Sequence, residues 1–140
     1  MIKFVKRLAS VTALLFIASQ AMAEYVVVVN PSNTANLTKE DVAKLFLAKT
    51  KAFPDGSQSK PVNHEENNEA RSNFDQSVLE KSPSQMKAYW SRLLFTGKAV
   101  PIEEMSSDAD IINFISKNPD AIGYIDAANV TPDVKVLFSY

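Results

Sequence analysis

The stretch Tyr25-Val26-Val27-Val28-Val29 decides the fold class, because five strand-forming residues follow one another with no polar residue between them. A strand with one solvent face alternates apolar and polar residues, whereas a strand covered on both faces has an unbroken apolar run. Coverage on both faces is typical of a parallel sheet with flanking helices. The run therefore predicts an α/β fold with a mostly parallel sheet, and Asn30-Pro31 predicts the end of the strand.

A first helix is predicted after this strand. Thr38 has the side chain of an N-cap residue, and Asp41 stands three residues later, where it can complete a capping box. The apolar residues that follow at helical spacing are Val42, Leu45 and Phe46. Phe53-Pro54-Asp55-Gly56 then predicts a turn, because Pro fixes φ and Gly accepts a positive φ.

The rest of the chain continues the same mixture of helices and strands. We expect a short strand over 60–63, helices around 70–78, 83–96 and 108–117, and strands over 121–125 and 134–138. The second of these helices has the clearest pattern, since Ser82 begins a capping box and Gly97 suits its end. Its predicted apolar face consists of Met86, Tyr89, Trp90, Leu93 and Leu94. The aromatic residues expected in the core are Phe46, Phe74, Trp90, Phe95 and Phe114.

Residues 1–23 have the pattern of a cleaved signal peptide. Three basic residues precede the apolar stretch 8–17, and Ala21-Met22-Ala23 matches an A-x-A cleavage site. The apolar stretch is well short of the roughly 20 residues that span a bilayer. We therefore expect an exported, soluble, periplasmic protein without a membrane span, whose mature part is a single domain over 24–140.

Composition narrows the function of this mature part. Residues 24–140 contain 12 basic and 16 acidic residues, a net charge of −4 with His neutral. An acidic surface argues against nucleic acid or an anionic membrane as a general partner. The chain has no cysteine, so packing rather than disulfides must stabilise it in an oxidising compartment.

Three segments resemble the periplasmic phosphate-binding proteins of phosphate ABC transporters. Residues 45–56 are similar to the family's I-F-x-G-K … W-x-D-G segment, residues 62–74 to its V-x-R-x-D-G-S-G-T-R-x-x-F segment, and residues 119–125 to its P-G-A-I-G-Y-V strand. The three occur in the family's order and cover most of residues 24–126. The resemblance implies a single three-layer lobe of the type 2 periplasmic binding fold and a non-enzymatic, ligand-binding function. A full binding protein of this family closes two such lobes on its ligand, and 117 residues supply one.

The second segment carries the family's anion-binding loop, and this chain departs from it. In the family an Arg, an Asp and a Ser-Gly-Thr run wrap the phosphate at a helix N-terminus. Here the Arg position is His64, the Asp position is Glu66, and the Gly-Ser-Gly-Thr positions are Asn67, Asn68, Glu69 and Ala70. Both hydroxyl donors are missing, and Arg71 is the one cation that remains. Three carboxylates, those of Glu65, Glu66 and Glu69, each oppose an anion at close range by about 1 to 4 kcal/mol.

Two interpretations of this loop remain open. In the first, a small anion or another solute binds in a concave site, to which Lys98 is a further contributor. The candidate ligand-binding residues are then Ser32, Asn33, Thr34, His64, Asn67, Asn68 and Arg71. In the second, which we weigh more heavily, the glutamates stabilise the dipole of a solvated helix start and Arg71 pairs with a nearby carboxylate.

The sequence gives little support for a catalytic, metal-binding or cofactor-binding function. There is no Cys nucleophile, His64 is the only imidazole, and no G-x-S-x-G motif is present. The three glycines form neither a dinucleotide fingerprint nor a P-loop. His64 with Glu66 and Glu69 matches no metal-ligand spacing. The carboxylates of Glu103 and Glu104 are expected in a solvated loop. We therefore expect no enzyme, no cofactor and no metal.

Two functions from different classes follow. The first is a periplasmic recognition domain related to phosphate transporter substrate-binding proteins, with a degraded anion loop that makes phosphate a poor ligand. The second is a module that has lost small-ligand binding and recognises a protein partner in an envelope assembly. The lost hydroxyls and the added carboxylates favour the second function, whereas the family resemblance favours the first.

Overall fold

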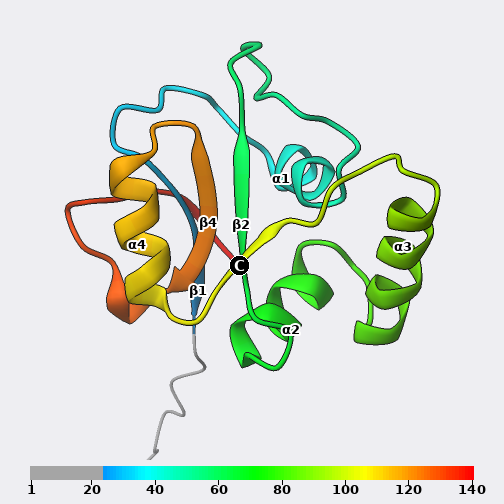
Figure 1. Cartoon of the computed structure of the whole chain (residues 1–140). Coiled ribbons are helices and arrows are strands. Elements are labelled where there is room, and N and C mark those ends of the chain that lie inside the picture. Colours follow the sequence, from blue (N-terminus) through cyan, green and yellow to red (C-terminus); the bar gives the residue numbers. More distant parts are fainter. Residues whose placement is uncertain (1–23) are drawn as a thin grey trace, which may run out of the picture.

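The computed structural model describes residues 24–140, and the predicted signal peptide lies outside the described residues. The elements in chain order are β1 (Tyr25–Val29), α1 (Lys39–Phe46), β2 (Lys60–His64), α2 (Glu69–Ser77), α3 (Pro83–Phe95), β3 (Glu103–Met105), α4 (Asp108–Lys117), β4 (Ala121–Asp126), the 3-10 helix η1 (Ala127–Asn129) and β5 (Lys135–Ser139) (Figure 1). None of the helices in this range is long and apolar enough to cross a membrane.

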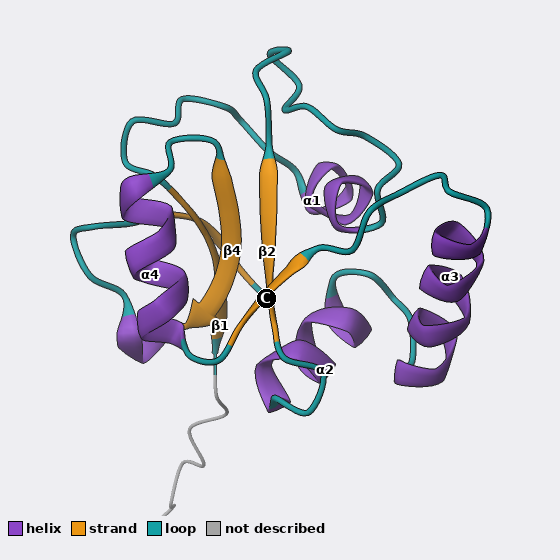
Figure 2. Cartoon of the chain, viewed as in Figure 1, coloured by secondary structure: helices purple, strands orange, loops and turns teal. Residues whose placement is uncertain are grey.

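The five strands form one mixed sheet in the order β3-β2-β4-β1-β5 (Figure 2). β2 is parallel to β3 and β4, whereas β1 is antiparallel to β4 and β5. The α/β fold class is confirmed, but the sheet is mixed where the apolar run in β1 suggested mostly parallel pairing. The reason is physical: an unbroken apolar run reports coverage of both faces and says nothing about the direction of neighbouring strands.

The sheet separates two apolar cores, which confirms three layers. One core contains side chains from α1, α2 and α3 together with Val27 and Val29 of β1. The other contains Ile111 and Ile115 of α4 together with the alternate residues Val26 and Val28. Figure 1 shows α4 on one side of β4 and α1, α2 and α3 on the other. Both faces of β1 are therefore covered, as its sequence predicts.

The predicted capping residues begin the helices. The Thr38 hydroxyl accepts from the Asp41 N–H of α1, and the Asp41 carboxylate accepts from the Thr38 N–H. Ser82 makes the same reciprocal pair with Gln85 at α3. At α4, the Ser107 hydroxyl accepts from the backbone N–H of Asp110. These bonds satisfy amides that would otherwise lack partners at each helix start.

Gly123 in β4 allows α4 to lie close to the sheet. A Cβ built at this position would stand 3.0 Å from Ile111 Cγ2 of α4 and 3.1 Å from Val62 Cγ2 of β2. Such contacts are tighter than a side chain normally makes, so only glycine fits without displacement. The position of α4 matters for the site because its first residue is Asp108.

α3 departs from its predicted packing. Met86 is its only fully buried residue, Leu94 is 44% exposed and Phe95 is 94% exposed. The expectation that Phe95 lies in the core is therefore wrong, and Trp90 and Phe114 are half-buried. The helix stands at the edge of the molecule beyond α1 and α2 (Figure 1). It contacts α2 and, through the Tyr89 hydroxyl, the Leu47 carbonyl oxygen, so only part of its apolar face is covered. The Glu103-Glu104 segment, expected as a loop, forms the edge strand β3.

Candidate functional site

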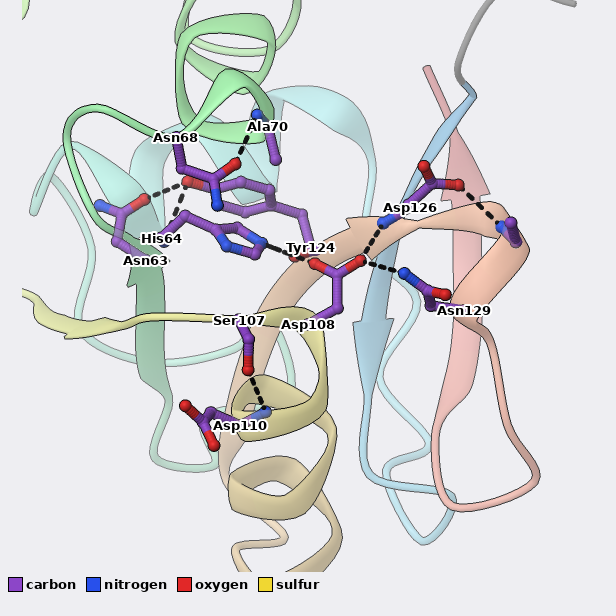
Figure 3. Close-up of polar contacts among 11 residues, drawn as sticks. Asn63, His64, Asn68, Ala70, Ser107, Asp108, Asp110, Tyr124, Asp126 and Asn129 are labelled. Carbon is purple, nitrogen blue, oxygen red and sulfur yellow. Dashed lines mark hydrogen bonds and ion pairs between the residues drawn. The ribbon is translucent and has the colours of Figure 1, made fainter.

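His64 ends β2 and is completely buried. Its Nε2 lies 2.9 Å from the carbonyl oxygen of Tyr124 and 3.1 Å from Oδ1 of Asp108 (Figure 3). Both neighbours are acceptors, so Nε2 carries the proton and donates toward them. Nδ1 is buried and has no hydrogen-bond partner among the described residues. The imidazole is therefore directed into the protein rather than toward an external ligand.

Asp108 places a carboxylate at the N-terminus of α4. It accepts hydrogen bonds from the Asp126 N–H at 3.1 Å and from Asn129 Nδ2 at 2.8 Å, in addition to its contact with His64. Burial alone would raise the pKa of Asp108, but the hydrogen bonds from His64, Asn129 and the Asp126 backbone outweigh it and lower that pKa. This carboxylate is an anion supplied by the chain itself, held by three donors.

Tyr124 connects this network to the core. Its hydroxyl donates to Oδ1 of Asn63 at 2.6 Å and accepts from the backbone N–H of His64 at 3.3 Å. Its ring stacks on Phe74 with the centroids 4.0 Å apart. Burial raises the pKa of the Tyr124 phenol far above its usual value. Tyr124 is therefore a neutral structural residue that fixes the end of β2.

Arg71, in the first turn of α2, is held from three sides. Its Nη1 donates to the carbonyl oxygen of His64 at 2.9 Å and contacts Oε1 of Glu104 at 3.1 Å. Its Nε lies 3.6 Å from Oδ2 of Asp75, one helical turn further on. Burial raises the pKa of Asp75 to about 6, which Arg71 opposes and Glu66 reinforces. The predicted pairing of Arg71 with nearby carboxylates is confirmed.

The remaining residues of the loop leave little room for an anion. The Asn68 side-chain oxygen caps α2 by accepting from the Ala70 N–H at 2.9 Å. This backbone N–H, which could otherwise donate to an anion, is therefore already occupied. Asn67 and Glu69 are exposed. A shallow hollow beside the start of α2 is lined by Asn68 and Glu69 and by the carboxyl-bearing Asp108 and Asp126. Its wall is acidic, which opposes binding of an anion.

The other group of predicted ligand residues lies elsewhere. Ser32, Asn33 and Thr34 follow β1 and line a hollow shared with Asp55 and Asp120, at the end of the sheet where β2 and β4 begin. His64 and Arg71 lie at the opposite end of the strands, where β2 ends. The structure therefore does not bring the two groups together, because β1 runs antiparallel to β4 and its end points away from theirs. Lys98 lines a third hollow, beside α3.

Several residues of this region were not predicted from the sequence. Asp75 could have been found, since it stands four residues after Arg71 on a helix. Glu104 is distant from its partner Arg71 in the sequence, and Asp108 from its partner His64, and no local pattern indicates either contact. A further cavity of about 220 Å³ between α2 and α3 is lined by Arg71 and Asp75, with Trp90 on the opposite wall. Within residues 24–140 no three potential metal-ligating side chains gather.

Solved structures of phosphate-transport proteins share this fold. An ABC-type phosphate transport receptor from Vibrio cholerae matches with a TM-score of 0.62 and 18% identity, over 82% of this chain and 46% of that protein. PstS from Borrelia burgdorferi matches with a TM-score of 0.61 and 16% identity, over 82% and 47%. A protein from Clostridium perfringens, assigned as a phosphate ABC transporter substrate-binding protein, was solved with bound phosphate. It matches with a TM-score of 0.61 and 16% identity, over 82% of this chain and 45% of that protein.

The comparisons show the fold. No protein-family model matches the sequence, and no curated protein matches it significantly. The chain spans less than half the length of the three solved proteins. The predicted single lobe of the periplasmic binding fold is thus confirmed at the level of architecture.

Proposed function

We propose that this chain is an exported, non-enzymatic recognition domain with the fold of a substrate-binding-protein lobe, and that its α2 loop does not hold phosphate tightly. The solved proteins with this fold are named for phosphate transport, which supports a binding function. The signal-peptide pattern of residues 1–23 supports a periplasmic location.

One observation carries the proposal: the groups that would meet an anion are already paired with carboxylates of the same chain. Arg71 is engaged by Asp75 and Glu104, and His64 is engaged by Asp108. An incoming anion would have to displace these carboxylates or approach them, at about 1 to 4 kcal/mol for each close unit charge. We therefore expect no tight phosphate complex through these residues.

The His64–Asp108 pair does not indicate catalysis. A catalytic imidazole must reach a proton on the substrate, and the exposed fraction of His64 is 0%. Its Nε2 is occupied by two acceptors, and its Nδ1 is enclosed by the protein. The pair therefore supports a structural role between β2 and α4.

The test is calorimetric titration of residues 24–140 with phosphate and with sulfate, accompanied by thermal unfolding. A ligand present at 100 times its dissociation constant would stabilise the folded state by about 2.7 kcal/mol, which a melting curve detects. We expect no shift with either anion at 1 mM. A dissociation constant in the micromolar range for phosphate would contradict the proposal.

A variant tests a separate obstacle to anion binding, the exposed carboxylate of Glu69, and leaves the pairs of Arg71 and His64 in place. Changing Glu69→Gly together with Ala70→Thr restores two residues of the resembled loop and removes one opposing charge. We expect measurable anion binding to appear in this variant, once thermal unfolding has shown that Thr is accommodated at the buried position 70. Glu40→Gly removes an exposed glutamate from the first turn of α1 instead, and is the matched control. Equal titrations of the two variants would show that the carboxylate at position 69 is not the obstacle.

A second candidate function, recognition of a protein partner, is favoured by the α3 region. Leu94, Phe95 and Val100 are 44%, 94% and 81% exposed, close together in the sequence. Scattered apolar residues are normal on surfaces, whereas a group of large ones marks an interaction site.

A further inference from the structure

Charge is unevenly distributed along this chain. The segment 81–102 contains four basic residues, Lys81, Lys87, Arg92 and Lys98, and no acidic residue. The other residues of the range 24–140 contain eight basic and 16 acidic residues. In a chain with a net negative charge, α3 and the segment that joins it to β3 therefore form a basic region.

The cations of this region are free to meet a partner. Lys87, Arg92 and Lys98 form no ion pair with another residue of the described part of the chain. All three are exposed, and the segment has no carboxylate that could neutralise them. Their field extends outward from the surface by about a Debye length, roughly 8 to 10 Å at moderate salt.

The same region carries the two most exposed large apolar residues of the described surface. Phe95 ends α3 and is 94% exposed, and Val100 in the following segment is 81% exposed. α3 stands apart at the edge of the molecule, with the segment 96–102 passing back from its end toward β3 (Figures 1 and 2). Exposed aromatic and aliphatic residues surrounded by cations are the composition of a binding surface.

A groove lies beside these side chains. It has a volume of about 600 Å³ and runs between the end of α1 and the segment after α3. Its apolar wall is formed by Leu45, Trp90, Val100 and Ile102. The charged residues that line it are Lys51, Lys98 and the ion pair of Lys60 with Glu103. Trp90 is half-buried and also lines the cavity between α2 and α3. The groove has room for one or two inserted side chains of a partner.

We propose that this surface, defined by Arg92, Phe95, Lys98, Val100 and the groove at Trp90, binds a protein segment in which carboxylates flank apolar side chains. The apolar side chains enter the groove and cover Phe95 and Val100, while the carboxylates meet the unpaired cations. This proposal rests on the second candidate function, recognition of a protein partner. It does not depend on whether the α2 loop binds an anion.

Two other occupants fit the surface less well. A bilayer cannot enter a groove of this volume, and the net charge of −4 on residues 24–140 opposes an anionic leaflet. A second copy of the chain, docked by the same face, would bring the unpaired Lys87, Arg92 and Lys98 of both copies together, and the one carboxylate of the groove, Glu103, already pairs with Lys60. A protein partner with its own acidic residues avoids both costs.

Site-specific crosslinking in the producing cells tests the proposal on the full chain. A photoreactive benzoylphenylalanine replaces Phe95 in one strain. In the control strain it replaces Val136, which is 41% exposed on the opposite edge strand β5. We expect one protein to be crosslinked from position 95 and not from position 136. Mass spectrometry of the crosslinked peptide should show Asp or Glu beside apolar residues.

Other crosslinking results would overturn the proposal. These are a crosslink from position 95 to lipid only, a crosslink to a second copy of this chain, a contact peptide without acidic residues, or equal yields from positions 95 and 136. None of these outcomes bears on the phosphate titration, so the two proposals fail separately.

Fluorescence then measures the contact with purified components. Trp90 is the only tryptophan of the chain, so its emission reports directly on the groove when the crosslinked segment is added as a synthetic peptide. We expect Phe95→Ala, and separately Arg92→Glu with Lys98→Glu, to weaken binding at least about tenfold. Lys117→Glu, an exposed position at the end of α4, is the matched control and should leave affinity unchanged. Affinity that is insensitive to both the charge reversal and added salt would refute the electrostatic part of the proposal.

Discussion

The sequence predicted His64 and Arg71 as residues of an anion-binding loop, and both are paired inside this protein. His64 donates to Asp108 and to the Tyr124 carbonyl, and Arg71 is engaged by Glu104 and Asp75. A buried polar or charged group is costly unless it is paired. Once these side chains point inward, carboxylates from α2, β3 and α4 are needed to satisfy them.

The buried carboxyl group of Asp75 predicts how the stability of the protein depends on pH. Its folded-state pKa of about 6 lies above the ordinary value of 3.8, because burial disfavours the charged form. Stability from the neutral form is fully present below about pH 4 and is lost as the pH rises through 6. Asp75→Asn removes this titration. We expect the free energy of unfolding of the wild type, relative to the variant, to fall by up to about 3 kcal/mol between pH 4 and pH 7.5.

Urea unfolding at the two pH values measures this difference. Asp133→Asn, which removes an exposed carboxylate before β5, is the matched control and should leave the pH dependence of the wild type in place. Parallel stability curves for wild type and Asp75→Asn would show that Arg71 compensates fully for the burial of this carboxylate.

The elements differ in how far their local sequence decided their surroundings. α1 and α3 both begin with a capping box that the sequence announces. α1 has three buried residues among eight, whereas α3 has one among 13. The difference arises because α1 packs against the sheet, while α3 stands at the edge of the molecule and contacts α2. An apolar stripe on a helix predicts a face that can be buried, and the fold decides whether anything covers it.

The contact between β4 and α4 gives a prediction for the elements. Gly123→Ala would place a methyl group about 3 Å from Ile111 and Val62, both fully buried. We expect it to lower the free energy of unfolding by about 1 to 3 kcal/mol, as overpacking does in a dense core. Chemical denaturation measures the loss.

A double substitution separates this crowding from other effects. Val62→Ala removes the Cγ2 atom that a methyl group at position 123 would meet. Combined with Gly123→Ala, it should cost clearly less than the sum of the two single changes. Simple additivity would show that the methyl group is accommodated by a shift of α4 and not by contact with Val62.

For the whole molecule, the predicted signal-peptide cleavage site lies directly before β1, whose bonds stabilise the fold. The Glu24 carbonyl oxygen accepts from the Ala127 N–H at 2.8 Å, and Tyr25 is the first residue of β1, paired with Asp126. Cleavage after Ala23 preserves all of these bonds, whereas cleavage a few residues later would remove part of β1, which lies between β4 and β5 in the sheet. We expect the secreted protein to begin at Glu24, which intact-mass measurement of the periplasmic fraction checks. Ala23→Leu should leave the unprocessed chain, and normal processing of that variant would contradict the assigned site.

The sequence alone determined the local features of this protein. The continuous run Tyr25–Val29 predicted a strand covered on both faces, and Thr38 and Ser82 marked two helix starts, because these signals depend on residues within a few positions. Three motifs in register indicated the fold. Arg71 was expected to pair with a carboxylate, and it does.

Only the tertiary structure decided what depends on strand direction and distant contacts. Because β1 runs antiparallel to β4, Ser32 and His64 lie at opposite ends of the strands, so the residues predicted as one site are separate. The approach of Asp108 to His64 joins residues 44 positions apart, and no periodicity encodes it. Phe95 is exposed because α3 stands at the edge of the molecule (Figure 1), where no described residue covers the end of the helix. Burial and pairing of this kind follow from how elements pack, which a local pattern of residues does not specify.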